Sequence, residues 1–183
     1  MAGYISEIEQ LRKMQNIERL SSTFKIRSYS LAEHSYYIGI LFIKLAELES
    51  INLNPKDIET VLTHDFMETY TGDLVSTAKN LSGETSNWWN QIEFKIAEVY
   101  DIKKYTDAGI MSMLGVGSRK YNLFKLCDIL DLYLFSLEER QLGNNTKGII
   151  RVYDVCRKEI FEICDVNDFK RIVDIMNYFN FEV

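Results

Sequence analysis

The chain contains few of the residues that interrupt helices: one proline, Pro55, and 9 glycines among 183 residues. This scarcity excludes a protein assembled from many tight turns and permits long helices. The sequence also lacks any run approaching the roughly 20 apolar residues of a membrane span. Its amino-terminal stretch lacks the apolar segment of a secretory signal. We therefore expect a cytoplasmic protein that does not associate with membranes.

Cysteine is also sparse, and its three positions, Cys127, Cys156 and Cys164, show no CxxC spacing. An odd number of cysteines without close pairs is typical of free thiols in a reducing compartment, which excludes a disulfide-stapled fold. Each cysteine falls within an apolar helical pattern, so we expect all three to pack in the core.

Positive charge is scarcer than negative charge, since 21 Lys and Arg against 27 Asp and Glu give a net charge of −6. The basic residues occur in scattered pairs rather than in clusters. Nonspecific binding to nucleic acid requires clustered Lys and Arg that displace counterions, so we do not expect a nucleic-acid polymer as a partner. A small anionic ligand, which needs one local basic spot, stays compatible with this composition.

What the chain does contain is a helical periodicity of apolar residues over most of its length. A length of 183 residues fits one domain, residues 1–183, with a full hydrophobic core. No segment shows a convincing strand pattern, so we predict an all-α, single-domain helical bundle. The expected helices cover residues 4–20, 30–49, 54–69, 86–100, 118–142, 147–163 and 167–179, and the stretch 101–118 is the least defined.

Local capping signals support several of these boundaries. Ser30 and Glu33 have the spacing of a capping box, in which the two side chains satisfy free backbone N–H groups. Asn54 followed by Pro55 predicts a second helix start, with Asn as the cap and Pro at the first helical position. The sequence Gly-Asn-Asn at 143–145 predicts the end of the long helix before it.

Histidine is scarce, and its two positions, His34 and His64, lie in predicted helices. His64 is followed directly by Asp65, and Glu68 lies one turn further on the same face. Asp128 lies in the middle of another apolar helix, where a charge is costly unless it is paired or bound to a metal. Two imidazoles and two carboxylates suit a divalent ion such as Mn, Fe, Co, Ni or Zn. The pattern therefore predicts a metal site.

Each of these residues also has a plainer interpretation. A single histidine on an apolar helix is more often a hydrogen-bonded core residue than a ligand, because buried polar groups are usually paired. Asp128 could form an ordinary helix salt bridge with Lys125, and Asp131, one turn later, competes with Asp128 for the ligand role. We expect the pair at 138–139 to lie on a structural or solvated face and the two tryptophans at 88–89 on a packing or dimer surface.

Four segments, in the same order, resemble the HD-domain phosphohydrolase superfamily. They are Ala-Glu-His-Ser at 32–35, His-Asp-x-x-Glu-x-x-Thr-Gly-Asp-Leu at 64–74, Lys-x-x-Asp at 125–128 and Glu-Glu-x-x-x-Gly-Asn at 138–144. The sequence is most similar to the bacterial HD-domain 5′-deoxynucleotidases, and the similarity covers about residues 12–145. A His-Asp pair alone is a weak signal, whereas four segments in the right order are a strong one.

The resemblance implies a fold and a ligand set. It implies a helical HD domain that binds one divalent transition metal ion (Co, Mn, Zn, Fe or Ni). The four implied metal ligands are His34, His64, Asp65 and Asp128.

The resemblance also implies roles for four residues around the metal. Glu68 orients or deprotonates the attacking water, or passes a proton to the leaving oxygen. Asp73 lies beside the sugar or the scissile phosphate and shares the acid/base work. Arg19 corresponds to an arginine near the phosphate, and Lys79 to a lysine that faces the substrate mouth.

The chain departs from the family pattern at the pocket edge. Leu20 stands where the family has a tryptophan after the arginine, and Val-Ser-Thr at 75–77 replaces a proline-rich turn. These differences affect the expected contacts with the base or sugar and leave the ligand set intact.

The function expected from this resemblance is hydrolysis of a deoxynucleoside 5′-phosphate to a deoxynucleoside and inorganic phosphate. The first alternative is a deoxynucleoside triphosphate phosphohydrolase on the same site, with an additional Mg ion and with Lys79, Lys120 and Lys125 around its mouth. A more remote alternative is a non-catalytic, metal-binding helical regulatory protein. The implied partners are a small deoxynucleotide and further copies of the chain, in a homodimer or higher homo-oligomer.

Overall fold

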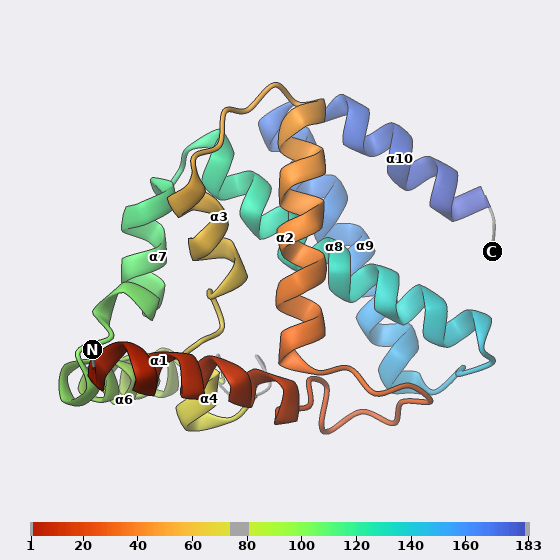
Figure 1. Cartoon of the computed structure of the whole chain (residues 1–183). Coiled ribbons are helices and arrows are strands. Elements are labelled where there is room, and N and C mark those ends of the chain that lie inside the picture. Colours follow the sequence, from red (N-terminus) through yellow and green to blue (C-terminus); the bar gives the residue numbers. More distant parts are fainter. Residues whose placement is uncertain (1, 74–80, 182–183) are drawn as a thin grey trace.

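The structure, a computed structural model, describes residues 2–73 and 81–181, and most of these residues lie in helices (Figure 1). The α-helices are α1 (Ala2–Arg12), α2 (Leu31–Leu48), α3 (Pro55–Leu62), α4 (Glu68–Thr71), α6 (Gly83–Tyr100), α7 (Asp107–Leu114), α8 (Arg119–Gln141), α9 (Lys147–Asn167) and α10 (Lys170–Phe181), and the 3-10 helices are η1 (Lys13–Asn16) and η2 (Lys103–Tyr105). These described residues contain no strand; Glu18 and Ser30 form an isolated antiparallel bridge. The predicted all-α class is confirmed.

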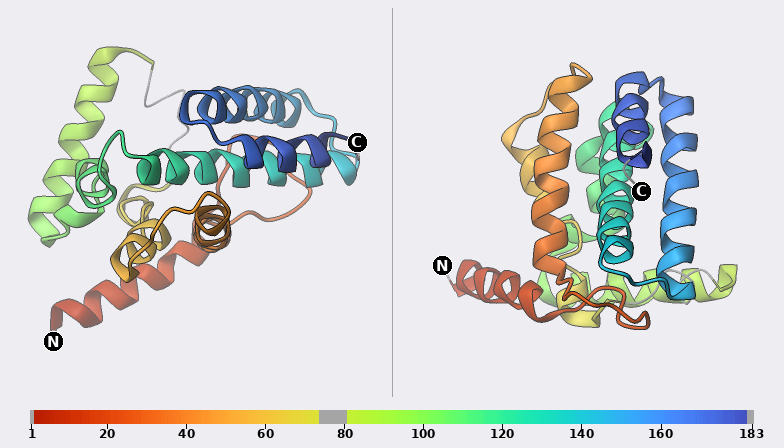
Figure 2. Two further views of the ribbon diagram at one scale, coloured as in Figure 1. Left: turned by 90° about the horizontal axis from the view of Figure 1, so that it is seen from above. Right: turned by 90° about the vertical axis from the view of Figure 1, so that its right-hand side faces the viewer.

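Helix α8 is the central element of the fold. Figure 2 shows α2, α8 and α9 as successive layers, with α8 in the middle. Leu123, Leu126 and Leu130 of α8 are almost completely buried in the main core, together with Phe42 of α2 and Ile160 of α9. Because α8 is covered on two faces, the polar side chains that it carries are held at fixed positions within the core.

Helix α3 approaches α2 closely at a glycine. A Cβ atom on Gly39 would lie 2.5 Å from Cδ2 of Leu62, so a larger residue would require the Leu62 side chain to move. The close contact keeps the end of α3, and the turn that follows it, against the amino-terminal half of α2.

The capping signals read from the sequence are confirmed. The Ser30 hydroxyl accepts from Glu33 N, and the Glu33 carboxylate accepts from Ser30 N, which completes the capping box of α2. Asn54 and Asp57 form the same arrangement at the start of α3, with Pro55 at the first helical position. Local side-chain chemistry therefore determines where these two helices begin.

Two predicted helices end earlier than the periodicity suggests. The first helix ends with η1 at Asn16, and residues 17–30 form a loop whose ends pair through Arg19 N to Tyr29 O and Leu31 N to Ile17 O, both 2.8 Å. The helix predicted for 54–69 stops at Leu62, and residues 63–67 form a turn before α4.

The lower end of the bundle is a separate layer. In Figures 1 and 2, α1, α4 and α6 lie across the end of α2. Phe66 and Met67, in the turn before α4, are buried in a second apolar cluster with Ala97, Ile102 and Tyr105. This cluster explains the turn at 63–67, because an unbroken helix would direct these side chains elsewhere. The poorly defined stretch 101–118 contains η2 and α7.

Three further observations concern the cysteines, the length of the apolar helices and Trp88. Cys127, Cys156 and Cys164 are buried and free, as predicted. None of the described helices is both long and apolar enough to span a bilayer. Trp88 is 64% exposed on α6, which fits a surface position for this side chain.

Candidate metal centre

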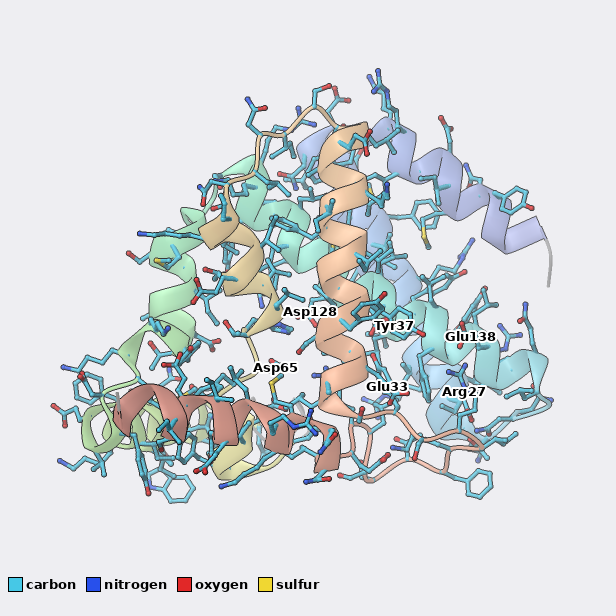
Figure 3. All side chains as sticks on the ribbon, viewed as in Figure 1. Arg27, Glu33, Tyr37, Asp65, Asp128 and Glu138 are labelled. Atoms are coloured by element: carbon cyan, nitrogen blue, oxygen red, sulfur yellow. The ribbon has the colours of Figure 1, made fainter. Side chains whose placement is uncertain are left out.

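The four predicted metal ligands come from three parts of the chain and meet beside α2. His34 lies in the first turns of α2, His64 and Asp65 in the turn after α3, and Asp128 in the middle of α8. Asp65 Oδ2 lies 3.5 Å from His34 Nε2 and 3.2 Å from His64 Nε2, and Asp128 Oδ1 lies 3.3 Å from His34 Nε2. Figure 3 shows Asp65 and Asp128 on the same side of α2. The structure therefore brings all four predicted ligands together.

The positions of His64 and Asp65 differ from the prediction in one respect. Both residues were expected on one helix, with Glu68 on the same helical face. The main chain instead turns between them and Glu68, which is the first residue of α4. This turn lets His64 Nδ1 reach the carbonyl oxygen of Val61, at 2.7 Å, and leaves Nε2 facing Asp65.

The cluster fits a divalent ion. His34 and His64 are buried, and within the described part of the chain their Nε2 atoms make no hydrogen bond. Ligand atoms about 2.1 Å from an ion are separated by about 3.0–3.4 Å in octahedral or tetrahedral geometry. The measured separations of 3.2–3.5 Å match this spacing. Two imidazoles and two carboxylates suit Mn, Fe, Co, Ni or Zn.

The electrostatics of the cluster favour a cation. Burial opposes ionisation of Asp65, but His64 and Arg19 lower the pKa of this carboxyl well below its ordinary value. Burial likewise opposes ionisation of Asp128, and the neighbouring imidazole of His34 outweighs it, so the pKa of Asp128 is also lowered. For His64, burial lowers the pKa and Asp65 raises it, with a net upward shift. Two carboxylates thus stay ionised in the core and attract positive charge.

Arg19 and Glu68 adjoin the cluster. Arg19 Nη1 donates to Asp65 Oδ2 at 2.5 Å. Burial opposes the charge on Arg19, whereas Asp65, Asp128 and Glu68 support it, and the pKa of the guanidinium is raised. Glu68 is buried at the start of α4. The sequence analysis expected Glu68 at the attacking water and Arg19 near the phosphate, and the structure places both side chains next to the four predicted ligands.

Asp73 and Lys79 complete the predicted set. Asp73 Oδ2 accepts from Leu20 N at 3.1 Å, so Asp73 lies against the turn that carries Arg19. Leu20 has a positive φ of 51°, a left-handed conformation that this hydrogen bond supports. Lys79 lies outside the described residues.

Three residues near the centre have roles that the sequence analysis missed. Asp131 was considered only as a competitor for the place of Asp128; its Oδ2 instead lies 2.8 Å from Nδ1 of His34 and accepts from the Tyr29 hydroxyl at 2.5 Å. Burial, followed by the charge of Asp131, raises the pKa of Tyr29 well above its ordinary value, so the hydroxyl stays protonated. Glu139 is fully buried, whereas Glu138 beside it is exposed.

Glu139 organises the loop that precedes α2. Its carboxylate accepts from Ile26 N at 2.7 Å, Arg27 N at 2.8 Å and Asn144 Nδ2 at 2.6 Å. The loop, residues 17–30, carries both Arg19 and Tyr29. The expected alternatives for this pair were a structural or a solvated face, and burial and hydrogen bonds give Glu139 the structural role.

The comparisons with known proteins agree with this geometry. Residues 8–173 match the family model described as 5′-deoxynucleotidase YfbR-like. The chain belongs to this family. The 5′-deoxynucleotidases YfbR of Salmonella paratyphi B and Salmonella newport are each 26% identical to it over 152 residues, 77% of this chain and 76% of theirs. As a member of the YfbR-like family, the chain is a hydrolase of the nucleotide phosphohydrolase class.

Solved structures show the same fold. An HD-domain phosphohydrolase from Listeria innocua has a TM-score of 0.76 at 21% identity, covering 96% of this chain and 89% of its own. The cyanophage S-2L HD phosphohydrolase DatZ, bound to dA and one catalytic Zn²⁺ ion, has a TM-score of 0.64 at 16% identity, covering 91% and 95%. The YfbR-like chain therefore has the HD-domain fold.

Proposed function

We propose that this YfbR-like phosphohydrolase removes the 5′-phosphate from deoxynucleoside monophosphates and releases a deoxynucleoside and inorganic phosphate. One divalent transition metal ion is held by His34, His64, Asp65 and Asp128. The observation that carries the proposal is the cluster of His34, His64 and Asp65, with Asp128 Oδ1 3.3 Å from His34 Nε2, next to Arg19 and Glu68. The curated relatives named 5′-deoxynucleotidase support the substrate class.

When bound, the ion lowers the pKa of a coordinated water and polarises the phosphoryl group. Glu68 then takes the proton of the attacking water, for which its burial beside the ligands places it suitably. The guanidinium of Arg19 binds two phosphate oxygens, because its planar fork matches such a pair. Asp65 holds Arg19 in place before the substrate arrives, through the 2.5 Å contact.

In this proposal Asp73 acts at the leaving group. Its hydrogen bond from Leu20 N keeps it beside the Arg19 turn, where the bound phosphate and sugar meet. A carboxyl at that position can deliver a proton to the departing 5′-oxygen or accept a hydrogen bond from the sugar.

The ion pair between Lys120 and Asp57 favours a monophosphate over a triphosphate as the substrate. Lys120, one of three cations that a triphosphate would require, pairs with buried Asp57 at 2.9 Å on the α3 side of α8. Lys125 lies 3.9 Å from Asp128, close to the ligands. A short phosphate needs few cations, and Arg19 with Lys125 supplies two.

Product analysis tests the proposal. The protein, loaded in turn with Mn, Co and Zn, is incubated with dAMP, AMP and dATP, and phosphate, pyrophosphate and triphosphate are separated. We expect phosphate from dAMP; release of pyrophosphate or triphosphate from dATP would establish the triphosphatase instead. His64→Ala, purified identically, controls for contaminating phosphatases. If the loaded protein hydrolysed no nucleotide and Asp65→Ala altered stability alone, the chain would be a regulatory metal-binding protein.

The proposed enzyme is a homodimer or higher homo-oligomer. Large apolar side chains on α6, including Trp88 and Phe94, are more than half exposed. Light scattering coupled to size-exclusion chromatography measures the mass directly, and a monomer at assay concentration would contradict this part of the proposal.

A further inference from the structure

The two histidines of the centre are oriented by different kinds of partner. His64 Nδ1 lies 2.7 Å from the main-chain carbonyl oxygen of Val61, a partner that no side-chain substitution removes. His34 Nδ1 lies 2.8 Å from the side-chain oxygen Oδ2 of Asp131. In both rings the Nδ1 atom is therefore engaged away from the cluster, and Nε2 faces it. We infer that Asp131 is a positioning residue, whose carboxylate accepts the Nδ1 proton of His34 and so directs the Nε2 lone pair of His34 at the metal.

The hydrogen bonds around Asp131 settle where the proton of His34 lies. An aspartate carboxylate offers acceptors alone, so the atom facing it must be a donor. Tyr29 has one hydroxyl proton, and the 2.5 Å contact assigns it to Asp131 Oδ2. Tyr29 Oη also lies 3.0 Å from His34 Nδ1, but its proton is already committed. His34 therefore carries its proton on Nδ1, the tautomer in which Nε2 can bind a metal.

Packing holds the side chains of His34, Tyr29 and Asp131 in this arrangement. Tyr29 stacks on Phe135 with ring centroids 4.1 Å apart and the ring planes 12° from parallel. Asp128, Asp131 and Phe135 follow one another at intervals of three and four residues, so one face of α8 presents all of them to α2. A ligand of the metal and the group that orients a second ligand thus come from the same helix.

Asp131 can be replaced without crowding the fold. A groove of about 210 Å³ lies beside it, lined by residues of the 17–30 loop, α2 and α8 that include Arg27, Glu33, Tyr37 and Glu138. Figure 3 shows these four residues on the side of α2 away from Asp65 and Asp128. Asparagine keeps the shape of aspartate, and leucine has room to turn into the groove. Both variants are therefore suitable probes of the carboxylate.

The first measurement is metal affinity. The inference that it tests rests on the proposed metal site. Co²⁺ is titrated into metal-free wild type, Asp131→Asn and Asp131→Leu by calorimetry. We expect the dissociation constant to rise about tenfold for asparagine and up to about 100-fold for leucine. Asp57→Asn is the matched control, because it also converts a buried, ion-paired carboxylate to an amide, far from the ligands. It is expected to lower the melting temperature and leave cobalt affinity unchanged.

The second measurement separates orientation from general damage. With two histidines in the chain, the cobalt-loaded protein should show two exchangeable imidazole N–H resonances shifted by the paramagnetic ion. Asp131→Asn should move or broaden the His34 resonance and leave that of His64, which the Val61 carbonyl holds, in place. Wild-type affinity and spectra in both Asp131 variants would overturn the inference. Failure of the wild type itself to bind cobalt would instead refute the metal site and the proposed function.

Discussion

Replacing Glu139 with glutamine is expected to destabilise the protein by about 2–3 kcal/mol, although the residue touches no predicted ligand. The buried carboxylate accepts three hydrogen bonds: Ile26 N and Asn144 Nδ2 donate to Oε2, and Arg27 N donates to Oε1. A glutamine oxygen placed at the Oε2 position keeps two of these bonds in uncharged form. Its amide nitrogen then opposes Arg27 N, so that two donors face each other.

The magnitude follows from this count. A main-chain N–H left without an acceptor costs about 1–3 kcal/mol, and the partial access of water to the loop favours the lower part of that range. Loss of the negative charge weakens the other two bonds by a further fraction of a kcal/mol each. The matched control is Glu138→Gln, the adjacent position, where the side chain is about half exposed and pairs with Arg27. An exposed ion pair contributes about 0–1 kcal/mol.

Urea denaturation of the metal-free wild type, Glu139→Gln and Glu138→Gln measures both effects. The pH dependence of stability provides a second check. Burial raises the pKa of Glu139, but the hydrogen bonds from Ile26, Asn144 and Arg27 lower it by more. The pKa of this carboxyl in the folded state is therefore below its ordinary value of 4.5. A carboxyl with a lowered folded-state pKa stabilises the fold above its unfolded pKa and loses that contribution as the pH falls through the folded value. The difference in the free energy of unfolding between wild type and Glu139→Gln should therefore be constant near neutral pH and decrease below about pH 4.5. Equal stability of the two glutamine variants at pH 7 would refute the reasoning.

We expect three further experimental outcomes for the candidate metal centre. Adding Mn or Co to the metal-stripped protein should stabilise it by about 2.7 kcal/mol at a metal concentration 100 times Kd, and His64→Ala should abolish the rise in Tm measured by scanning calorimetry. Glu68→Gln should lower kcat by about 10²–10⁴-fold with bound metal unchanged, measured by steady-state kinetics and elemental analysis; a wild-type kcat would remove Glu68 from the reaction. Arg19→Gln should raise KM for dAMP about tenfold or more, because a charge-assisted contact to phosphate is lost, and an unchanged KM would contradict the assigned role.

The helix starts at Leu31 and Pro55 could be predicted because their causes are local. Each depends on a side chain that bonds to main-chain groups within three residues, as Ser30 and Asn54 do. The all-α class follows from the apolar periodicity for a similar reason. Interactions this short in sequence are visible without any knowledge of how the chain packs.

The turn at 63–67 could not be predicted in the same way. The apolar period continues through Phe66 and Met67, and sequence alone therefore extends the helix. The second cluster decides the outcome, because Ala97 and Tyr105, some 30 to 40 positions later in the chain, bury these two side chains. The proposed ligand His64 still lies beside Asp65 in the structure, although the helix expected to carry both residues ends at Leu62.

The position of the loop at 17–30 is the part of the site that was hardest to predict from the sequence. It lies between α1 and α2 and has little regular structure, yet it carries Arg19 and Tyr29. Its position depends on bonds to Asp73 and Glu139, 53 and 113 residues away from their partners in the chain. Such contacts leave no periodic signal, so the sequence did not distinguish a structural from a solvated position for Glu139.

One pattern on α8 nevertheless contained the missing information. Asp128, Asp131, Phe135 and Glu139 are spaced by three, four and four residues, which places them along a single, largely buried face of α8. Three carboxylates on one stripe of a buried helix require partners, because isolated charges there are costly. In the structure the partners are, in order, the centre, the Nδ1 atom of His34 and the main chain of the 17–30 loop. The stripe therefore ties a proposed metal ligand, the partner of His34 Nδ1 and the loop that carries Arg19 to one helix, so a rotation of α8 would disturb all three together.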